Sequence, residues 1–348
     1  MKTLLIGKTL GTGGTSRYTT NLVANLKIQK LDFDFINLKR FYDLPGKYKK
    51  RLDLVRKFPR KIDYDNYDLI HFLEFDYSLY GMLRHLGRRK ERPKIIKTSH
   101  GMFKREEIFS GLLSKYVLKP FLCYAQKNVQ RNVDAVIYVS DEERELFLKT
   151  FKLDLAKTYV MYLASSFETY KGSISDLIEH KDNTILFVGR VERRKNIEKI
   201  FEVARLLPDM SVKVVGHIND FKYYHELQEI KPINAEFIID LPDSELITTY
   251  QRARYFVSFS RWESCPVTYL ESISQGTPVI AYSMPIWKMS QNGCGYRVLT
   301  PDDCVTKIRE LEKDYDSAIQ RTINTADLFT WEKVAKETIQ IYQQICNT

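Results

Sequence analysis

The feature that most constrains the fold is a regular alternation between short apolar runs and longer helix-like stretches. The runs are rich in β-branched and aromatic residues, which favours buried strands. Buried strands joined by helices are typical of parallel α/β sheets covered on both faces. Six strands are expected in the first half, at residues 3–6, 33–37, 69–72, 95–98, 135–139 and 159–162, and six in the second, at 184–188, 212–215, 236–239, 255–259, 278–281 and 296–299.

Two sets of six strands predict two doubly wound domains, which agrees with a length of 348 residues. We expect a first Rossmann-like domain at residues 1–165, a polar linker at 166–181 that contains Gly172, and a second Rossmann-like domain at 182–325. The remaining residues, 326–348, should form a terminal helix. Its apolar face at 331–345 needs a surface to cover, and either domain could supply one.

Charge is distributed unevenly between the halves. Residues 1–165 carry 32 Lys and Arg against 18 Asp and Glu, whereas residues 166–348 carry 22 against 26. Basic residues gather at 39–61, interleaved with aromatic and apolar side chains, and again at 84–97, and an apolar stretch with lysines follows at 112–122. This pattern predicts contact with an anionic membrane surface, or a solvated face that steers an anionic ligand. No nucleic-acid-binding motif accompanies the charge, so we expect no nucleic-acid partner.

Cysteines and the amino terminus indicate the compartment. The five cysteines have no C-x-x-C spacing, which argues for free thiols in a reducing compartment and against structural zinc. The apolar stretch before Gly7 is too short for a signal peptide, and no window approaches the ~20 apolar residues of a spanning helix. A cytoplasmic protein, peripheral on the inner face of the cell membrane, is therefore expected.

Two strand-to-helix loops carry candidate ligand-binding residues. The first, after strand 3–6, contains Gly13 and Gly14 and is either a tight turn or a loop whose backbone approaches an anion. The second contains Arg190 at the end of strand 184–188 and Lys195 at the start of the next helix. Both cations can point to the crevice at the strand carboxyl ends and match a diphosphate. The neighbouring Arg193 and Arg194 are expected to be solvated.

The stretch 260–278 reads as strand, loop, helix and strand, with two carboxylates in a segment that should be buried. Ser264 is expected to cap the helix, and Gly276 to end it. Glu263 lies just before the helix and Glu271 inside it. Burial of an unpaired carboxylate costs several kcal/mol, so each Glu needs polar partners such as sugar hydroxyls.

Taken in order, these residues resemble the retaining glycosyltransferases of family 4, which have the GT-B fold of two Rossmann-like domains facing a cleft. The resemblance rests on Gly189-Arg190 followed by Lys195, on Glu263 and Glu271 in an E-x7-E signature, on the Gly13-Gly14 loop and on His100 after a strand. It implies that Arg190 and Lys195 bind the donor diphosphate, that Glu263 holds the transferred sugar and that Glu271 holds the ribose. It also implies donor contacts from the following residues: Gly13, Gly14, and the backbone amides of Ser264, Cys265 and Val267. Ser264 stands where the family frequently has Gly, and the loop at 283–288 lacks the family's usual residues.

The resemblance implies an enzyme that moves a sugar from a nucleoside-diphosphate donor (UDP or GDP) to a lipid-linked or polysaccharide acceptor, with catalytic roles for Glu263, His100, Arg190 and Lys195. No metal and no cofactor beyond the sugar nucleotide are expected, because fixed cations and a helix amino terminus can stabilise the leaving diphosphate. Asp32 and Asp34 form a D-x-D triplet, but in an alternating strand they are expected to be exposed carboxylates. The alternatives are a non-catalytic sugar-nucleotide or membrane binding protein, a sugar phosphorylase and a nucleotide-sugar epimerase.

Overall fold

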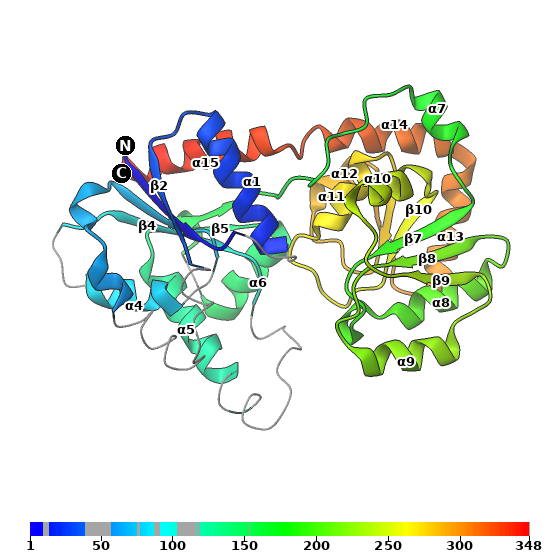
Figure 1. Cartoon of the computed structure of the whole chain (residues 1–348), viewed down its shortest axis with the longest axis horizontal. Helices are drawn as coiled ribbons and strands as arrows, with labels where there is room; N and C mark the ends of the chain where they lie inside the picture. Colours follow the sequence, from blue (N-terminus) through cyan, green and yellow to red (C-terminus); the bar gives the residue numbers. More distant parts are fainter. Residues whose placement is uncertain are drawn as a thin grey trace. The chain divides into compact units, whose positions relative to one another are not determined.

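The computed structural model describes residues 1–9, 14–38, 57–74, 77–86, 91–102, 116, 119–152 and 154–347. Contacts divide the chain into two compact units: the first comprises Met1–Leu163 and Trp331–Thr348, and the second comprises Ala164–Thr330 (Figure 1). Of the basic and apolar segments singled out in the sequence, residues 39–56, 87–90 and most of 112–118 lie outside the described residues.

The first unit is built on a six-stranded parallel sheet with the order β2-β1-β3-β4-β5-β6. Its strands are β1 (Thr3–Gly7), β2 (Phe33–Asn37), β3 (Leu69–Phe72), β4 (Lys94–Ser99), β5 (Ala135–Tyr138) and β6 (Thr158–Val160). Its helices are α1 (Gly14–Ile28), α4 (Tyr77–Leu86), α5 (Lys119–Asn132), α6 (Asp141–Phe151) and α15 (Trp331–Cys346), with short 3₁₀ turns at Phe58–Lys61, Tyr64–Asn66 and Leu155–Lys157. Figure 1 shows α1 and α15 on one side of this sheet and α4 and α5 on the other.

The terminal helix α15 returns to the first unit, which decides between the two packing surfaces that the sequence left open. It packs against α1 and buries Val334, Ala335, Thr338, Ile341, Tyr342 and Ile345, which share one helical face. The Tyr342 hydroxyl lies 2.5 Å from Nδ1 of His71, and His71 Nε2 lies 2.7 Å from the Thr98 hydroxyl. Burial lowers the pKa of His71 to about 3, so the ring is neutral and serves to attach α15 to the sheet.

The second unit has a six-stranded parallel sheet with the order β12-β11-β10-β7-β8-β9. Its strands are β7 (Thr184–Val188), β8 (Ser211–Val215), β9 (Ala235–Ile238), β10 (Tyr255–Ser258), β11 (Val279–Ala281) and β12 (Gly295–Arg297). Its helices are α7 (Ile174–Glu179), α8 (Ile197–Leu206), α9 (Phe221–Ile230), α10 (Asp243–Arg252), α11 (Val267–Ser274), α12 (Trp287–Gln291), α13 (Pro301–Leu311) and α14 (Tyr315–Ala326), with 3₁₀ turns at Arg193–Lys195 and Glu312–Asp314. Figure 1 shows α8 and α9 on one side of the sheet and α10, α11 and α14 on the other.

Each of the twelve predicted strands is present, with ends that differ from the prediction by at most two residues. The agreement follows from burial, because strands such as β1, β3 and β7 have every residue buried and therefore appear in the sequence as uninterrupted apolar runs.

Strand order determines where a ligand can bind in each unit. In the second sheet the order reverses between β7 and β10, and in the first it reverses between β1 and β3. Loops that leave neighbouring strands in opposite directions open a crevice at the strand carboxyl ends, where open α/β sheets bind their ligands. In the second unit this point lies between the loop that contains Arg190 and the loop that contains Glu263.

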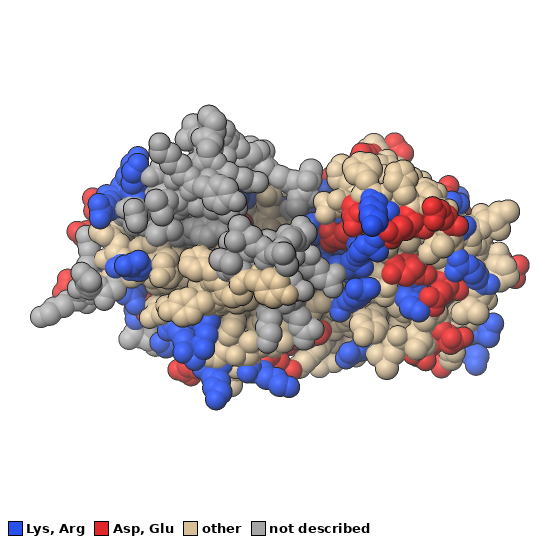
Figure 2. Space-filling model, turned by 90° about the horizontal axis from the view of Figure 1, so that it is seen from below, with Lys and Arg blue, Asp and Glu red and all other residues tan. Residues whose placement is uncertain are grey.

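On the face drawn in Figure 2, Lys and Arg alternate with Asp and Glu across the second unit, whereas the described part of the first unit shows basic groups with fewer acidic ones among uncharged residues. Within the described ranges, none of the helices combines the length and the apolar character needed to cross a bilayer.

Candidate active site

The loop between β7 and α8 brings cations to the switch point of the second sheet. Strand β7 ends at Val188, and Gly189 and Arg190 follow directly. The strands β7 and β8 remain very close beyond their ends: Gly216 has a φ of +152°, and a Cβ on it would lie 2.0 Å from the carbonyl oxygen of Gly189. The chain then forms the 3₁₀ turn Arg193–Lys195 before α8 begins.

The loop between β10 and α11 carries Glu263, and the start of α11 differs from the sequence-based prediction. Helix α11 begins at Val267 with Pro266 at its N-cap, so Ser264 lies too early to cap it. The Ser264 hydroxyl is buried and has no hydrogen-bond partner among the described residues. The end of the helix agrees with the prediction, because Gly276 follows it with a left-handed φ of +71°.

The two loops meet in a chain of five alternating charges. Lys195 Nζ lies 2.5 Å from Oε1 of Glu263, and Arg194 Nη1 lies 3.4 Å from its Oε2. Arg194 Nη2 in turn lies 3.1 Å from Oε1 of Glu192, and Arg190 Nη2 lies 3.2 Å from the same oxygen. Each of these charged groups contacts the next in the order Arg190, Glu192, Arg194, Glu263 and Lys195. Three cations and two carboxylates therefore share one site.

Exposure differs sharply along this chain of charges. The Arg190 side chain is 53% exposed, whereas those of Lys195 and Glu263 are only 12% and 10% exposed. Burial would raise the pKa of the Glu263 carboxyl, but Lys195 and Arg194 more than compensate, and the pKa lies below its usual value. Glu263 is therefore a carboxylate at neutral pH. Among the three cations of this site, Arg190 is the most exposed to solvent.

The prediction that Arg193 and Arg194 are both solvated is right for the first and wrong for the second. Arg193 is half exposed and donates two hydrogen bonds to Glu226, at 2.7 and 2.6 Å. Arg194 is 13% exposed and also donates to the carbonyl oxygen of Trp262, at 2.5 Å. A 3₁₀ turn has about three residues per turn, so consecutive side chains leave it about 120° apart and adjacent cations can have different surroundings.

Two further residues, Ser283 and Tyr250, were not predicted from the sequence and contact Glu263 and Glu271 respectively. The backbone N–H of Glu263 donates to the Ser283 hydroxyl at 3.2 Å, so the loop that departs from the family pattern still contacts the site. Glu271, which is 2% exposed, accepts a hydrogen bond from the Tyr250 hydroxyl at 3.1 Å. Cys265 is buried, and Val267 is the first residue of α11, where backbone N–H groups lack partners within the helix.

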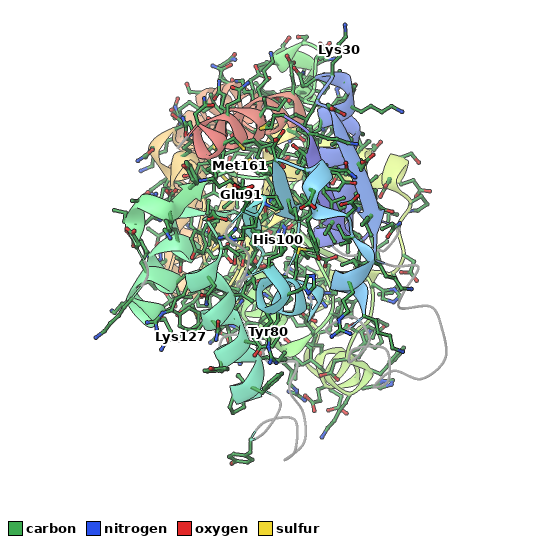
Figure 3. The ribbon with its side chains drawn as sticks, turned by 90° about the vertical axis from the view of Figure 1, so that its left-hand side faces the viewer. Lys30, Tyr80, Glu91, His100, Lys127 and Met161 are labelled. Atoms are coloured by element: carbon green, nitrogen blue, oxygen red, sulfur yellow. The ribbon has the colours of Figure 1, made fainter. Side chains whose placement is uncertain are left out.

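Two predicted residues of the first unit are described, Gly14 at the start of the helix after β1 and His100 directly after β4. Gly13 lies outside the described residues, whereas Gly14 opens α1 and is exposed, and among the described residues a Cβ on it would meet no atom within 4 Å beyond its chain neighbours and its own helix backbone. His100 follows β4, and Figure 3 shows it near the middle of the view, whereas Lys30 and Lys127 extend to the periphery.

The imidazole of His100 is held in one orientation. Nε2 lies 2.9 Å from the carbonyl oxygen of Leu73 and so carries the proton, and the ring meets Tyr18 edge-on with 4.6 Å between centroids. Burial lowers the pKa of His100 to about 4, the Leu73 bond opposes this shift, and Lys97 adds to it. The ring is therefore neutral, and Nδ1 is the nitrogen that can accept a proton or a hydrogen bond.

The D-x-D triplet, which in other proteins can bind a metal, is exposed here, and Asp34 contacts Tyr67 and Lys2. Asp32 and Asp34 are exposed on and beside β2, as predicted. Asp34 accepts a hydrogen bond from the Tyr67 hydroxyl at 2.8 Å and pairs with Lys2 at 3.3 Å, and its pKa is lowered mainly by the Tyr67 bond. Across the described ranges, no three His, Cys, Asp or Glu side chains gather as a metal site would require.

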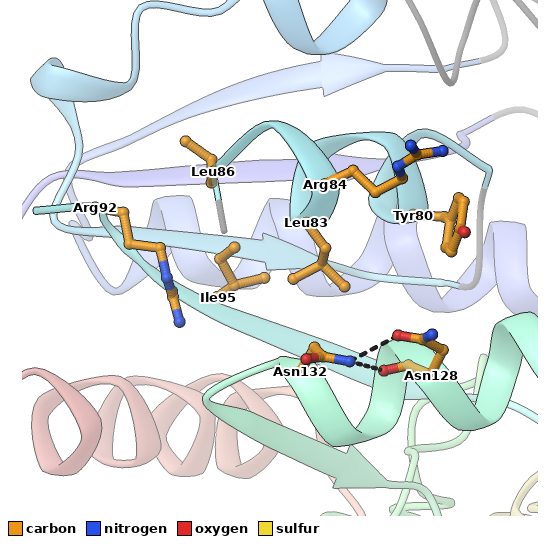
Figure 4. Close-up of a pocket in the computed structure, with 8 residues that line it drawn as sticks. All are labelled: Tyr80, Leu83, Arg84, Leu86, Arg92, Ile95, Asn128 and Asn132. Carbon is orange, nitrogen blue, oxygen red and sulfur yellow. Dashed lines mark hydrogen bonds between the residues drawn. The ribbon is translucent and has the colours of Figure 1, made fainter. Parts of the chain in front are cut away.

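A separate pocket of about 340 Å³ lies in the first unit and contains none of the predicted site residues (Figure 4). Leu83, Leu86 and Ile95 supply its apolar part, and Asn128 and Asn132 face one another across one turn of α5. Arg92 at its edge is bound at 2.6 Å to Asp134. The candidate active site is therefore distinct from this pocket.

Comparison with known proteins agrees with this architecture. The description "Glycosyltransferase Family 4" matches residues 12–164, and "Glycosyl transferases group 1" matches residues 173–327. A solved structure of sucrose-phosphate synthase from Thermosynechococcus elongatus superposes with a TM-score of 0.76 at 17% identity, covering 99% of each chain. The fold is that of the GT-B glycosyltransferases. The chain belongs to glycosyltransferase family 4, since the two matches together account for most of its length.

Two curated relatives show how far the similarity extends. Alpha-monoglucosyldiacylglycerol synthase from Streptococcus pneumoniae is 27% identical over 257 residues, which cover 68% of this chain and 55% of the relative. O-antigen chain mannosyltransferase B from Escherichia coli is 23% identical over 292 residues, covering 77% and 74%. The chain thus spans little more than half the length of the first relative.

Proposed function

We propose that this protein is a retaining, metal-independent glycosyltransferase that moves a sugar from a UDP- or GDP-linked donor to a lipid-linked or saccharide acceptor. The observation that carries the proposal is the buried Lys195–Glu263 pair beside the half-exposed Arg190, at the switch point of the second sheet. Membership of family 4 supports it, as do relatives whose names describe the synthesis of a glucosyldiacylglycerol and of an O-antigen chain.

The arrangement suits cleavage of a glycosyl-phosphate bond. Negative charge builds up on the departing diphosphate, and Arg190, Lys195 and the amino terminus of α11 can stabilise it. Positive charge builds up on the sugar ring, and the Glu263 carboxylate can stabilise that charge while holding a sugar hydroxyl. In this proposal the acceptor attacks the face that the diphosphate leaves, and we assign no covalent nucleophile.

The remaining predicted residues have binding roles in this proposal. Glu271, beside Tyr250, would hold the ribose hydroxyls, and the backbone amides of Ser264, Cys265 and Val267 would face the sugar and phosphates. Gly14 would allow its backbone to approach the donor, since no side chain of the described residues lies within 4 Å of the position its Cβ would take. Neutral His100 would position the sugar or the acceptor through Nδ1.

We also propose that the protein works as a peripheral protein at the inner membrane face, with the basic first half in contact with anionic lipid. The excess of basic over acidic residues in the first half supports this proposal. Each Lys or Arg near an anionic surface contributes about 1 kcal/mol to the free energy of binding. Flotation with phosphatidylcholine vesicles, with and without phosphatidylglycerol, tests it. The proposal predicts binding only to the anionic vesicles at low salt, and equal recovery with both would contradict it.

Donor turnover tests the enzymatic proposal. A panel of UDP-, GDP- and ADP-sugars should first identify a donor by thermal shift, because a ligand that binds the native state stabilises it. Release of nucleoside diphosphate should then depend on acceptor and persist in EDTA. Tight donor binding without release would favour a sugar-nucleotide binding protein, and a requirement for orthophosphate would favour a phosphorylase.

A further inference from the structure

Glu192 contacts two of the three cations of the site, as many as Glu263 does, and nothing above assigns it a function. Its side chain is 11% exposed, and its Oε1 lies 3.2 Å from Arg190 and 3.1 Å from Arg194. Its other oxygen, Oε2, accepts a hydrogen bond from Asn219 Nδ2 at 3.1 Å. One carboxylate therefore holds two guanidinium groups with one oxygen and is itself held through the other.

The backbone around Glu192 is fixed independently of the two arginines. The neighbouring Val191 pairs with Ile218 in an isolated parallel bridge, and its N–H donates to the carbonyl oxygen of His217 at 2.9 Å. The N–H of Asn219 donates back to the carbonyl oxygen of Val191 at 3.2 Å. The loop after β8 thus anchors both the backbone beside Glu192 and its carboxylate, so the carboxylate is a fixed point to which longer side chains can attach.

We propose that Glu192 is a positioning residue that holds Arg190 and Arg194 in the geometry required by the donor diphosphate. The inference rests on the proposed function, because it assumes that these cations bind a diphosphate. Arg190 is half exposed and would otherwise lose much rotamer freedom when a ligand orders it. A carboxylate that already orders the guanidinium reduces this loss, and it also screens the repulsion between two neighbouring cations.

Removal of the Glu192 carboxylate should change the affinity for a diphosphate, and the sign of that change distinguishes a positioning role from a simple effect of net charge. If only net charge mattered, removing a carboxylate beside a diphosphate site would strengthen binding of the dianion, because one repulsive charge disappears. If positioning dominates, the same change weakens binding despite the gain in positive charge. Glu192→Gln should give an intermediate result, because its amide oxygen can still accept from a guanidinium while its charge is lost.

The chain offers a matched control on the same loop. Arg193 donates two hydrogen bonds to its own partner, Glu226, and is half exposed. Glu226→Ala removes the same charge and the same kind of pair as Glu192→Ala, and should leave the affinity for a diphosphate unchanged.

Calorimetric titration of the full chain with UDP and with GDP at low salt tests the inference, together with circular dichroism to show that each variant is folded. Wild type should bind at least one of the two nucleotides, Glu192→Ala should bind it about tenfold more weakly, as loss of a charge-assisted contact predicts, and Glu226→Ala should stay within about twofold. Asn219→Ala, which keeps the carboxylate but removes its anchor, should show a smaller loss and serves if Glu192→Ala fails to fold.

The outcomes separate the two proposals. Unchanged or tighter binding by Glu192→Ala, or by Asn219→Ala where that variant replaces it, overturns the positioning role while leaving the proposed function intact. Failure of the wild type to bind either nucleotide counts against the proposed UDP or GDP donor itself, and the positioning role falls with it. An equal loss in Glu226→Ala also overturns the inference, because it would show a general effect of charge on the loop.

Discussion

Glu263→Gln should destabilise the second unit measurably even without a ligand. The carboxylate of Glu263 is paired with Lys195 at 2.5 Å and with Arg194 at 3.4 Å, and all three side chains are at most 13% exposed. Breaking a buried pair by removing one partner costs about 3–5 kcal/mol, because the other charge remains buried. Arg194 keeps Glu192 and the glutamine keeps one acceptor oxygen, so the lower end, about 3 kcal/mol, applies.

Thermal unfolding of the ligand-free protein measures this cost. For a domain of 150–250 residues each kcal/mol shifts the melting temperature by about 2–4 °C, so we expect a decrease of about 6–12 °C. Glu226→Gln is the control, since the exposed Arg193–Glu226 pair should be worth less than about 1 kcal/mol. A Glu263→Gln melting temperature within 2 °C of wild type would refute the reasoning, because the pair would then contribute nothing.

The Lys195–Glu263 pair should make the stability of the folded protein depend on pH. The pKa of Glu263 in the folded state lies below its ordinary value, so between these two values the unfolded chain binds more protons. The stability due to Glu263 is therefore complete above its ordinary pKa of 4.5 and is lost as the pH falls through the folded pKa. Below pH 4.5 the melting temperatures of wild type and Glu263→Gln should converge, and a constant difference would contradict the assignment.

Three further changes have defined outcomes. His100 has a pKa near 4 against an ordinary 6.5, so its contribution to stability should be lost as the pH falls from 6.5 towards 4, and His100→Gln should flatten that slope in a pH series of melts. Gly216→Ala should cost at least about 2 kcal/mol in urea unfolding, because its Cβ would strike the Gly189 carbonyl oxygen at a positive φ, and a loss below 0.5 kcal/mol would contradict the close packing. Gly14→Ala should leave urea unfolding unchanged, since its Cβ would meet no side chain of the described residues, but should reduce donor turnover, because the methyl group would occupy space proposed for the donor; unchanged turnover would remove Gly14 from the site.

The strands and the main residues of the site were predictable from sequence because burial and position determine them. A strand covered on both faces is an apolar run, and a residue after its carboxyl end lies at the edge where ligands bind. The strand ends therefore predicted that Arg190, Lys195 and Glu263 lie near one switch point, and the structure connects these three residues through ion pairs that include Glu192 and Arg194.

The remaining features depend on where individual side chains point and on which residue begins a helix, and the residue types alone do not determine either. Arg193 and Arg194 are adjacent and chemically identical, yet a 3₁₀ turn sends one to Glu226 and the other to Glu263. The start of α11 depended on Pro266 taking the N-cap position that Ser264 suited by residue type. Glu192 did have a signal, since it is an acid within a basic run after a buried strand, and such an acid is a candidate to bind its neighbours.

The most direct test of the account is the stereochemistry and residue dependence of sugar transfer. With the donor identified by thermal shift and a lipid-linked or saccharide acceptor, NMR of the product and release of the nucleoside diphosphate should be followed for wild type and Glu263→Gln. We predict a product with the donor's anomeric configuration, and turnover at least about 100-fold slower in the variant when assayed below its melting temperature. An inverted product, or a folded variant that transfers sugar at the wild-type rate, would contradict the central claim.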